Sequence, residues 1–410
     1  MQSLSLRALH AALSSPAAAF RCRRRLQPGG GTGDKVFPPT FAGAVYAIER
    51  RRIPGHDEPV LCVVLDTVQS QANRMELALQ EAIDAGELQL PLLVVDFSAH
   101  DTSGDPAADL AAGRFIDRVG RLTSLQLPHR LADAILRDSE IDGVAFRHSD
   151  LGKALNRVSL ANATPVLQLC PSALVFGMWD STGPKGGLGP KFERAMVSEI
   201  VGIGAAWEED YRARGVRRDP VEISKKVSVL RKEDKSLLKV AEGKEKGLRP
   251  SELNHSSVPF DNPNCGLTID YAEQTTTLSL IALRRLRFPV GDQRDPARDQ
   301  AAHTLLAALG LCAATLAFEA GLDLRSRCLL WPEAPLSWEL LAKPGQEPET
   351  YSLDGPQART LVSEAAKAAV AAGLPWPTDP VTLQPSAELA KLVRLSQAEA
   401  AKDGGESEEG

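Results

Sequence analysis

An apolar run followed at once by an amphipathic segment is the feature that most constrains the fold of this chain. Residues 59–65 are apolar and rich in valine, which predicts a central β-strand. Apolar residues then recur every four positions from Met75 to Ile83 and predict a helix over residues 70–85 with one face against a sheet. Another apolar run, at residues 91–97, completes a β-α-β pattern. We therefore expect a sheet with a helix packed on it.

The beginning of that helix is polar and basic. Its first turns carry Gln69, Ser70, Asn73 and Arg74. Ser70 and Arg74 are four residues apart and share one face, and a helix start offers free backbone N–H groups and the positive end of the helix dipole. Phosphate is therefore a natural ligand at this position. The alternative is that Asp66 or Thr67 caps the helix and that the polar side chains are simply solvated.

A second segment is interpreted as a repeat of this arrangement. Residues 172–179 are strongly apolar and predict a strand, the glycine-rich sequence STGPKGGLGPK follows, and residues 192–203 are expected to form a helix. Small residues beside a cation let backbone N–H groups approach a phosphate closely. The candidates for this contact are Lys185, Gly186, Gly187, Lys191 and Arg194. One glycine-rich loop is a weak signal, but two strand-to-helix turns on comparable edges of one sheet predict a two-part grip on a nucleic-acid backbone.

Charge is segregated along the 410 residues. The formal net charge is −6, so the protein as a whole is no polycation. Residues 211–250 nevertheless carry 13 Lys and Arg against 6 Asp and Glu, and we expect this charged insertion to follow a nucleic-acid backbone electrostatically. A solvated charged helix is the alternative. Aromatic residues make up only 5% of the chain, which favours gripping the backbone over stacking bases.

Regular elements are also predicted at both ends of the chain. Residues 4–25 lack acidic residues and are expected to form a short helix and a basic arm. Periodicity further predicts strands at residues 265–279 and 324–331, and helices at residues 297–320, 357–372 and 386–397. No apolar run approaches the roughly 20 residues of a membrane span, so no membrane association is expected.

Motifs for catalysis or metal binding are scarce. The six cysteines lack the spacing of a zinc site or a disulfide framework, which fits a reducing cytoplasm. His129 and His255 are isolated, and loop hydrogen bonding is expected of both rather than acid–base catalysis. We expect no cofactor, no bound metal and no enzymatic activity. The alternative is a metal-dependent nuclease acting on RNA or DNA, with the metal near Asp66.

Five motifs in order carry a family resemblance. They are DTVQSQANR, LTSLQLPHRLADAILRD, SALVFGMWDSTGPKGGLGPKFERAMVSEI, LNHSSVPFDNP and IDYAEQTTTLSLIALRRLRF. Over residues 26–330 the chain resembles the backbone subunit of type I-G (formerly I-U) CRISPR surveillance complexes, a member of the RAMP superfamily. Such subunits assemble as a helical filament along the CRISPR guide RNA and present it for base pairing with target DNA in antiviral defence. The other expected partners are the large subunit and the guide-end-capping and processing subunit.

The resemblance implies an α+β fold with an RRM-like or ferredoxin-like palm, an antiparallel sheet with packed helices. The palm is expected over residues 26–335, with insertions at about 98–165 and at 207–262, the latter a candidate thumb. A helix and basic arm over residues 1–25 would precede it. A helical extension over residues 336–396 and a disordered acidic tail over 397–410 would follow.

The resemblance also implies RNA contacts, residue by residue. They are best supported at the helix entrance and at the glycine-rich loop. Further contacts are implied at Arg23, Arg24, Arg25, His129, Arg130 and His255, and in the candidate thumb at Arg217, Arg218, Lys225 and Lys226. A third possibility is a scaffold whose basic insertion binds an acidic partner protein.

Overall fold

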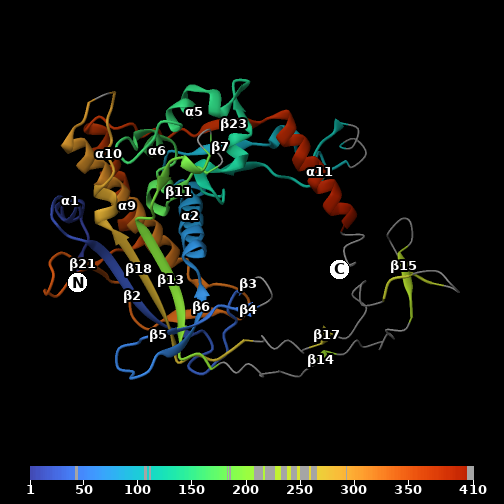
Figure 1. Ribbon diagram of the computed structural model, residues 1–410, viewed down its shortest axis with the longest axis horizontal. Coiled ribbons are helices and arrows are strands. Elements are labelled where there is room, and N and C mark those ends of the chain that lie inside the picture. Colours follow the sequence, from blue (N-terminus) through green and yellow to red (C-terminus); the bar gives the residue numbers. More distant parts are fainter. Residues whose placement is uncertain are drawn as a thin grey trace.

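A large mixed sheet forms the centre of the fold (Figure 1). The computed structural model describes residues 1–41, 45–105, 109, 112–181, 183, 186–206, 216–217, 227–231, 238–241, 247–249, 258–259, 266–291 and 293–403. Within them the sheet runs in the order β1 (Gln2–Ser3), β22 (Glu349–Ser352), β21 (Trp338–Leu341), β2 (Ala19–Pro28), β18 (Tyr271–Ser279), β13 (Met196–Ile203), β6 (Val60–Asp66) and β5 (Ile48–Arg51). Strands β19 (Leu322–Asp323) and β20 (Leu329–Pro332) join it beside β2. The β1–β22 pair is parallel, and the other described pairs of this sheet are antiparallel.

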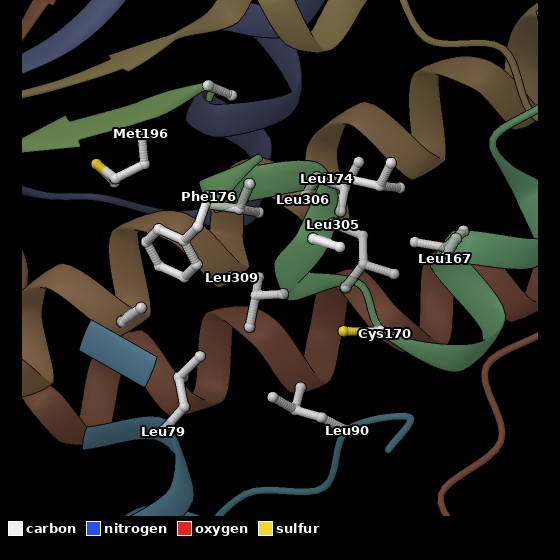
Figure 2. Packing of buried hydrophobic residues seen from close by; sticks show 14 of the residues in the cluster. Leu79, Leu90, Leu167, Cys170, Leu174, Phe176, Met196, Leu305, Leu306 and Leu309 are labelled. Carbon is white, nitrogen blue, oxygen red and sulfur yellow. The ribbon is translucent and has the colours of Figure 1, made fainter. Parts of the chain in front are cut away.

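Helices cover one face of this sheet. α2 (Val68–Asp84) and α9 (Pro296–Glu319) lie against the strands, and α1 (Leu6–Ser14) and α10 (Gly355–Ala371) pack on α9. Figure 2 shows Leu79 of α2, Met196 of β13 and Leu309 of α9 in the same apolar cluster. The cluster joins the sheet to its helices, and burial of this much apolar surface is the main force that holds the layers together.

Helix α9 is the core element of this helical layer. Of the helices in the described part of the chain, it alone is long and apolar enough to cross a membrane by length and composition, although no such segment is expected from the apolar runs of the sequence. However, 83% of its most apolar stretch is buried inside the fold. A helix that is hydrophobic all round is typical of the centre of a large protein, and α9 takes that role here.

A second, five-stranded sheet lies beyond the end of α2. Its order is β10 (Val144–Ala145), β9 (Ser139–Ile141), β23 (Val381–Pro385), β7 (Leu93–Asp96) and β8 (Arg121–Thr123). Strand β23 therefore inserts C-terminal sequence between β7, which precedes the first predicted insertion, and β9, which belongs to it. Because β21 and β22 also join the main sheet, the boundary expected at residues 335–336 does not separate structural units.

Several predicted elements are confirmed. They are β6, α2, β7, α9, α10 and the strand β18. Thr67 caps α2, with its Oγ1 accepting a hydrogen bond from the Ser70 backbone N–H at 3.2 Å. Gly321, just past α9, has a φ of +94°, as expected of a residue that ends a helix.

The second predicted strand-loop-helix unit is wrong. Residues expected to form a strand are the helix α7 (Ser172–Phe176) and the short strand β11 (Met178–Trp179), and the expected helix is mostly strand β13. Every residue of α7 is buried, and burial on all sides removes the periodicity that separates a short helix from a strand. The two units are therefore not repeats and do not lie on comparable sheet edges.

The expected N-terminal arm and C-terminal tail also differ. Arg23, Arg24 and Arg25 lie within β2, between β18 and the strands β20 and β21, so they belong to the centre of the sheet. At the other end, α11 (Ala387–Asp403) continues past Gln397, where disorder was expected to begin. In both cases tertiary pairing or helix propensity extends structure into sequence that looks simply charged.

The remaining described elements are short and lie between those above in the chain. They are β3 (Thr40–Phe41), β4 (Val45–Tyr46), η1 (Ser98–His100), η2 (Arg130–Ala132), α4 (Ala134–Arg137), η3 (Phe146–His148), α5 (Asp150–Leu155), α6 (Thr164–Leu169), η4 (Gly186–Leu188), β12 (Lys191–Phe192), β14 (Val216–Arg217), β15 (Val229–Arg231), β16 (Leu238–Val240), β17 (Val258–Pro259) and α8 (Leu280–Arg284).

Candidate nucleic-acid interface

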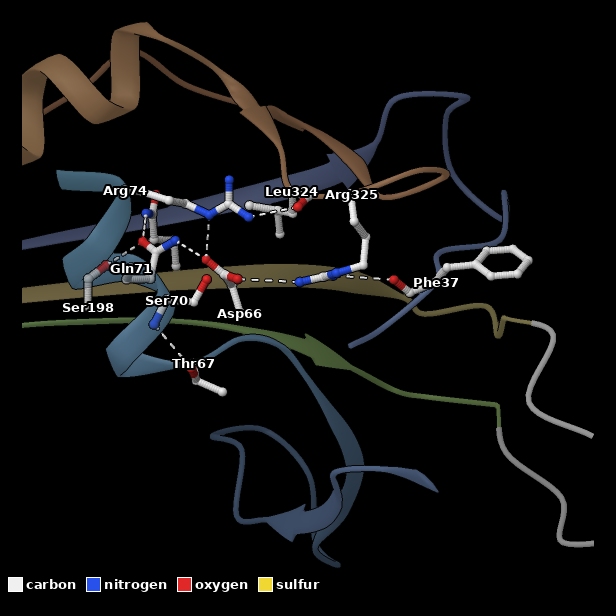
Figure 3. A network of polar contacts seen from close by, with 10 residues as sticks. Phe37, Asp66, Thr67, Ser70, Gln71, Arg74, Ser198, Leu324 and Arg325 are labelled. Atoms are coloured by element: carbon white, nitrogen blue, oxygen red, sulfur yellow. Dashed lines mark hydrogen bonds and ion pairs between the residues drawn. The ribbon is translucent and has the colours of Figure 1, made fainter. Parts of the chain in front are cut away.

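A buried carboxylate organises the N-terminal end of α2 (Figure 3). Asp66, the last residue of β6, is 1% exposed. Its Oδ2 accepts hydrogen bonds from Gln71 Nε2 at 2.6 Å and from Arg74 Nε at 2.9 Å, and its Oδ1 accepts one from Arg325 Nη2 at 3.3 Å. Arg74 also donates to the backbone oxygen of Leu324 at 2.7 Å. Asp66 therefore ties the start of α2 to the loop between β19 and β20.

Gln71 extends this network into the sheet. Its Oε1 accepts hydrogen bonds from Ser198 Oγ at 2.9 Å and from Gln274 Nε2 at 2.8 Å. Ser198 shares a further hydrogen bond of 2.7 Å with Thr276. Because these side chains are buried, their hydrogen bonds are strong and directional. The start of α2 is thus held in a fixed position over β13 and β18.

The polar residues predicted at the helix entrance divide into two groups. Gln69 and Asn73 are exposed and Ser70 is half-buried. Arg74 is bound to Asp66, and only 34% of its side chain is exposed. Its charge is therefore neutralised within the fold, and Gln69 and Asn73 are the groups that this helix offers to a ligand.

Arg130 joins α2 to the segment that follows α7. Its guanidinium donates to both carboxylate oxygens of Glu76 at 2.6 Å and to the backbone oxygen of Gly177 at 3.2 Å. Both members of the ion pair are buried, and Arg130 lies over the ring of Phe176. Burial raises the pKa of Glu76, and the charge of Arg130 opposes that rise. With Arg130 8% exposed, the direct phosphate contact expected of it is not available in this structure.

The contact of Arg130 with Glu76 and Gly177 is the Arg130 joint, and strands β11 and β12 form a hairpin directly after it. Met178 pairs with Phe192 and Trp179 with Lys191. Lys191 Nζ lies 5.6 Å from the centre of the Trp179 ring. A Cβ added to Gly177 would lie 2.9 Å from Arg194 Cγ, so the Arg194 side chain lies against the base of the same hairpin. The structure therefore brings Lys191 and Arg194 to the segment that Arg130 fastens to α2.

The cations of the hairpin are available to an anion. Lys191 and Arg194 are exposed, and among the described residues neither has an ion-pair partner. Gly186 and Gly187 lie in the turn η4 in the loop of the hairpin. Lys185 lies outside the described residues. Phosphate is a suitable ligand for the two exposed cations.

The open face of the main sheet is different. Alternation along β2 places Arg21, Arg23 and Arg25 on the face away from the helices. Each is paired with a glutamate: Arg21 with Glu339 at 2.6 Å, Arg23 with Glu273 at 2.7 Å and Arg25 with Glu333 at 3.3 Å. Arg51 of β5 is likewise paired with Glu199 at 2.8 Å. This face is therefore a ladder of opposite charges, not a cationic surface.

Arg24 points the other way. It is 8% exposed, lies over the ring of Phe318 in α9, and its pKa is lowered by burial. The phosphate contact expected of Arg24 is therefore not available in this structure. The expected contacts of Arg23 and Arg25 would compete with the glutamates that already bind them.

Comparison with known proteins finds a family that part of the chain resembles. The family described as CRISPR-associated protein GSU0053 matches residues 20–207. This part of the chain, a little under half of it, is similar to that CRISPR-associated family. No curated protein matches it closely enough to count as a relative.

The matched part of the chain includes the candidate interface. Asp66, the exposed start of α2, the Arg130 joint and the β11–β12 hairpin all lie within residues 20–207. The similarity to a CRISPR-associated family therefore falls on the part of the chain that carries the interface.

Some predicted contacts are not placed by the structure. Arg218, Lys225, Lys226 and His255 lie outside the described residues, and Arg217 belongs to β14 without a described side chain. His129 is exposed, and its backbone N–H donates to Asp133 Oδ2 at 3.1 Å. It precedes Arg130 directly, so it lies at the edge of the joint.

Sequence reasoning missed Trp179 and Glu76. The exposure of Trp179 depends on the pairing of Met178 with Phe192, which puts Trp179 and Lys191 on the outer side of the hairpin and which the sequence did not predict. Glu76 had no local signal either, since its partner Arg130 is 54 residues away.

Proposed function

We propose that this protein is a non-catalytic, RNA-binding backbone subunit of a type I CRISPR effector complex, of the I-G subtype that its motifs resemble. In this role copies of the chain assemble along the guide RNA as a helical filament. The guide is presented for pairing with target DNA, beside the large subunit and the guide-end-capping and processing subunit. The site of action is the cytoplasm.

The β11–β12 hairpin beside α2 is the observation that carries the RNA-binding role. Two cations without ion-pair partners among the described residues, Lys191 and Arg194, stand on a hairpin fastened to α2. Gln69 and Asn73 add uncharged hydrogen-bonding groups on the exposed side of the same helix. Charge and neutral polar groups in this combination suit a phosphate-sugar backbone and carry no base specificity.

The order of elements supports the RRM-like palm within this proposal. Along the chain, β2, α2, β13, β18, α9 and β21 follow one another with other elements inserted between them. This is the β-α-β-β-α-β order of a ferredoxin-like unit. In space, β21, β2, β18 and β13 are neighbours and antiparallel, with α2 and α9 on one face.

The environment of Asp66 favours a structural role over the nuclease alternative. A metal-binding carboxylate needs free lone pairs facing a substrate. Asp66 is buried and accepts hydrogen bonds from Gln71, Arg74 and Arg325. Incubation of the protein with labelled RNA and DNA plus Mg²⁺ or Mn²⁺ tests this reading. Cleavage that disappears in Asp66→Ala would overturn the non-catalytic assignment.

RNA binding is tested by the salt dependence of affinity. Lys191→Ala/Arg194→Ala should weaken binding of single-stranded RNA regardless of its sequence, and should reduce the slope of log affinity against log salt by about 0.7 for each phosphate that the variant no longer neutralises. Fluorescence anisotropy of a labelled RNA measures both. The matched control is Arg23→Ala/Glu273→Ala, which removes an ion pair of the sheet face without changing net charge. Equal slopes for all three proteins would refute the hairpin as the RNA site.

The filament role is tested by co-purification. Produced together with its CRISPR array and the other subunits, the protein should carry RNA of discrete length. A protein that purifies from such cells free of RNA would contradict the proposed function.

A further inference from the structure

We infer that Trp179 is a stacking platform for an unpaired nucleobase of single-stranded RNA, with the flanking phosphates bound by Lys191 and Arg194. The inference rests on the proposed function and extends it. It assigns a base contact to an interface whose other groups address only the backbone.

Exposure of Trp179 is imposed by the register of the hairpin. Met178 and Phe192 face each other across the two strands, and both are buried in the main core. Because side chains alternate along a strand, Trp179 and Lys191 must point outward. Trp179 is consequently 53% exposed, although tryptophan is a large apolar residue.

Contacts of the residues around it fix the backbone that carries this tryptophan. Directly after it, Asp180 is 3% exposed and forms an ion pair with Arg147 at 2.9 Å. The Asp180 backbone N–H donates to the Pro190 oxygen at 3.0 Å, which closes the hairpin. Before it, Arg130 binds the Gly177 oxygen. A rigid aromatic side chain loses little conformational entropy when a ligand stacks on it.

Charge on the hairpin selects the class of ligand. The acidic residues that follow the two strands each form an ion pair: Asp180 with Arg147 at 2.9 Å and Glu193 with Arg285 at 3.2 Å. On this hairpin, the charges left without an ion-pair partner among the described residues are those of Lys191 and Arg194. An exposed aromatic ring beside cations that lack an ion-pair partner among the described residues is complementary to an anion that carries aromatic rings. Stacking platforms and cations are the two components that single-stranded nucleic-acid sites combine.

The test compares the affinity for an RNA that carries bases with the affinity for an abasic oligomer. Trp179→Leu keeps an apolar residue but removes the ring, and Trp179→Phe keeps a smaller ring. Against an ordinary single-stranded RNA, Trp179→Leu should lose affinity roughly tenfold, because it removes the ring on which a base stacks. Trp179→Phe should lose less, because it keeps a smaller ring. Against an abasic oligomer of the same length, all three proteins should bind alike.

Trp331→Leu is the matched control. Trp331 is 71% exposed on β20 of the main sheet, and its removal should leave the affinity for both oligomers unchanged. Unchanged thermal unfolding temperatures show that the variants are folded.

Each contrary outcome has a distinct meaning. If Trp179→Leu binds ordinary RNA as the wild type does, while Lys191→Ala/Arg194→Ala weakens it, stacking is overturned and the proposed function stands. If Trp179→Leu changes only self-association, measured by sedimentation without RNA, the residue belongs to a protein interface and the inference is again overturned. If the wild type binds neither oligomer, the proposed function fails as well.

Discussion

Arg130 and Glu76 form a doubly hydrogen-bonded ion pair, with both oxygens of the carboxylate 2.6 Å from guanidinium nitrogens. Glu76 projects from the middle of α2, and Arg130 opens the turn η2, so the pair joins elements that are 54 residues apart. The same guanidinium binds the residue before the β11–β12 hairpin. One buried cation therefore sets the position of both halves of the candidate interface.

Loss of Arg130 should destabilise the fold strongly. Arg130→Met leaves the Glu76 carboxylate buried without its partner, which costs about 3–5 kcal/mol in comparable cases. Urea unfolding measures the change. The double variant Glu76→Leu/Arg130→Met should recover much of the loss, because two apolar residues leave no uncompensated charge. A double variant as unstable as Arg130→Met would show that the charge of Glu76 is not the cause.

The pH dependence of stability should report on the same pair. Burial raises the pKa of Glu76 in the folded state above its ordinary value of 4.5. The folded state then holds the proton more tightly, so this contribution to stability is complete below pH 4.5 and declines as pH rises through the raised pKa. Removing Arg130 removes the opposing charge, so in Arg130→Met the decline should be larger and reach a higher pH. Unfolding free energies from about pH 4 to about pH 8 measure it, and Glu76→Gln should abolish the decline. If the difference in unfolding free energy between Arg130→Met and Glu76→Gln does not change with pH over this range, the decline is not caused by Glu76.

Arg74 should behave as a structural residue and Lys191 as a binding residue. Arg74→Ala removes hydrogen bonds to Asp66 and to Leu324, and hydrogen bonds to charged groups contribute about 1.5–3 kcal/mol. We expect lower stability in urea and an unchanged salt slope for RNA binding. Lys191→Ala should do the opposite, since Lys191 is exposed and its ammonium group lies beside the Trp179 ring. A reduced salt slope in Arg74→Ala would place that arginine on the RNA instead.

The elements that could be predicted from the sequence are those whose local pattern agrees with their environment. Helix α2 has a clear apolar face, and α9 is too long to be a strand. The local pattern identified neither helix α7 nor strand β13. Residues of α7 are buried on every side, and β13 owes its conformation to pairing with β18 and β6 on its two edges.

The candidate site was predictable by residue type but not by role. Arg74, Arg130, Lys191 and Arg194 are all cations near polar or glycine-rich turns. Which of them face a ligand depends on their carboxylate partners. Glu76 is 54 residues away from Arg130 in sequence, and Asp66, the partner of Arg74, is buried at the end of strand β6. Ion pairing over long sequence separation is a property of the folded chain, and no local pattern specifies it.

Gly177 should control the position of the hairpin. Its φ of +85° favours glycine, and an added methyl group would lie 2.9 Å from Arg194 Cγ and 3.2 Å from the Phe192 oxygen. Gly177→Ala should therefore lower stability by more than about 1 kcal/mol and weaken RNA binding, because Arg194 is displaced. Gly86→Ala is the matched control: Gly86 has a φ of +72° but no atom within 4 Å of an added methyl group. It should lower stability through backbone strain alone and bind RNA like the wild type. Equal RNA affinity in the two variants would show that binding does not depend on where the hairpin holds Arg194.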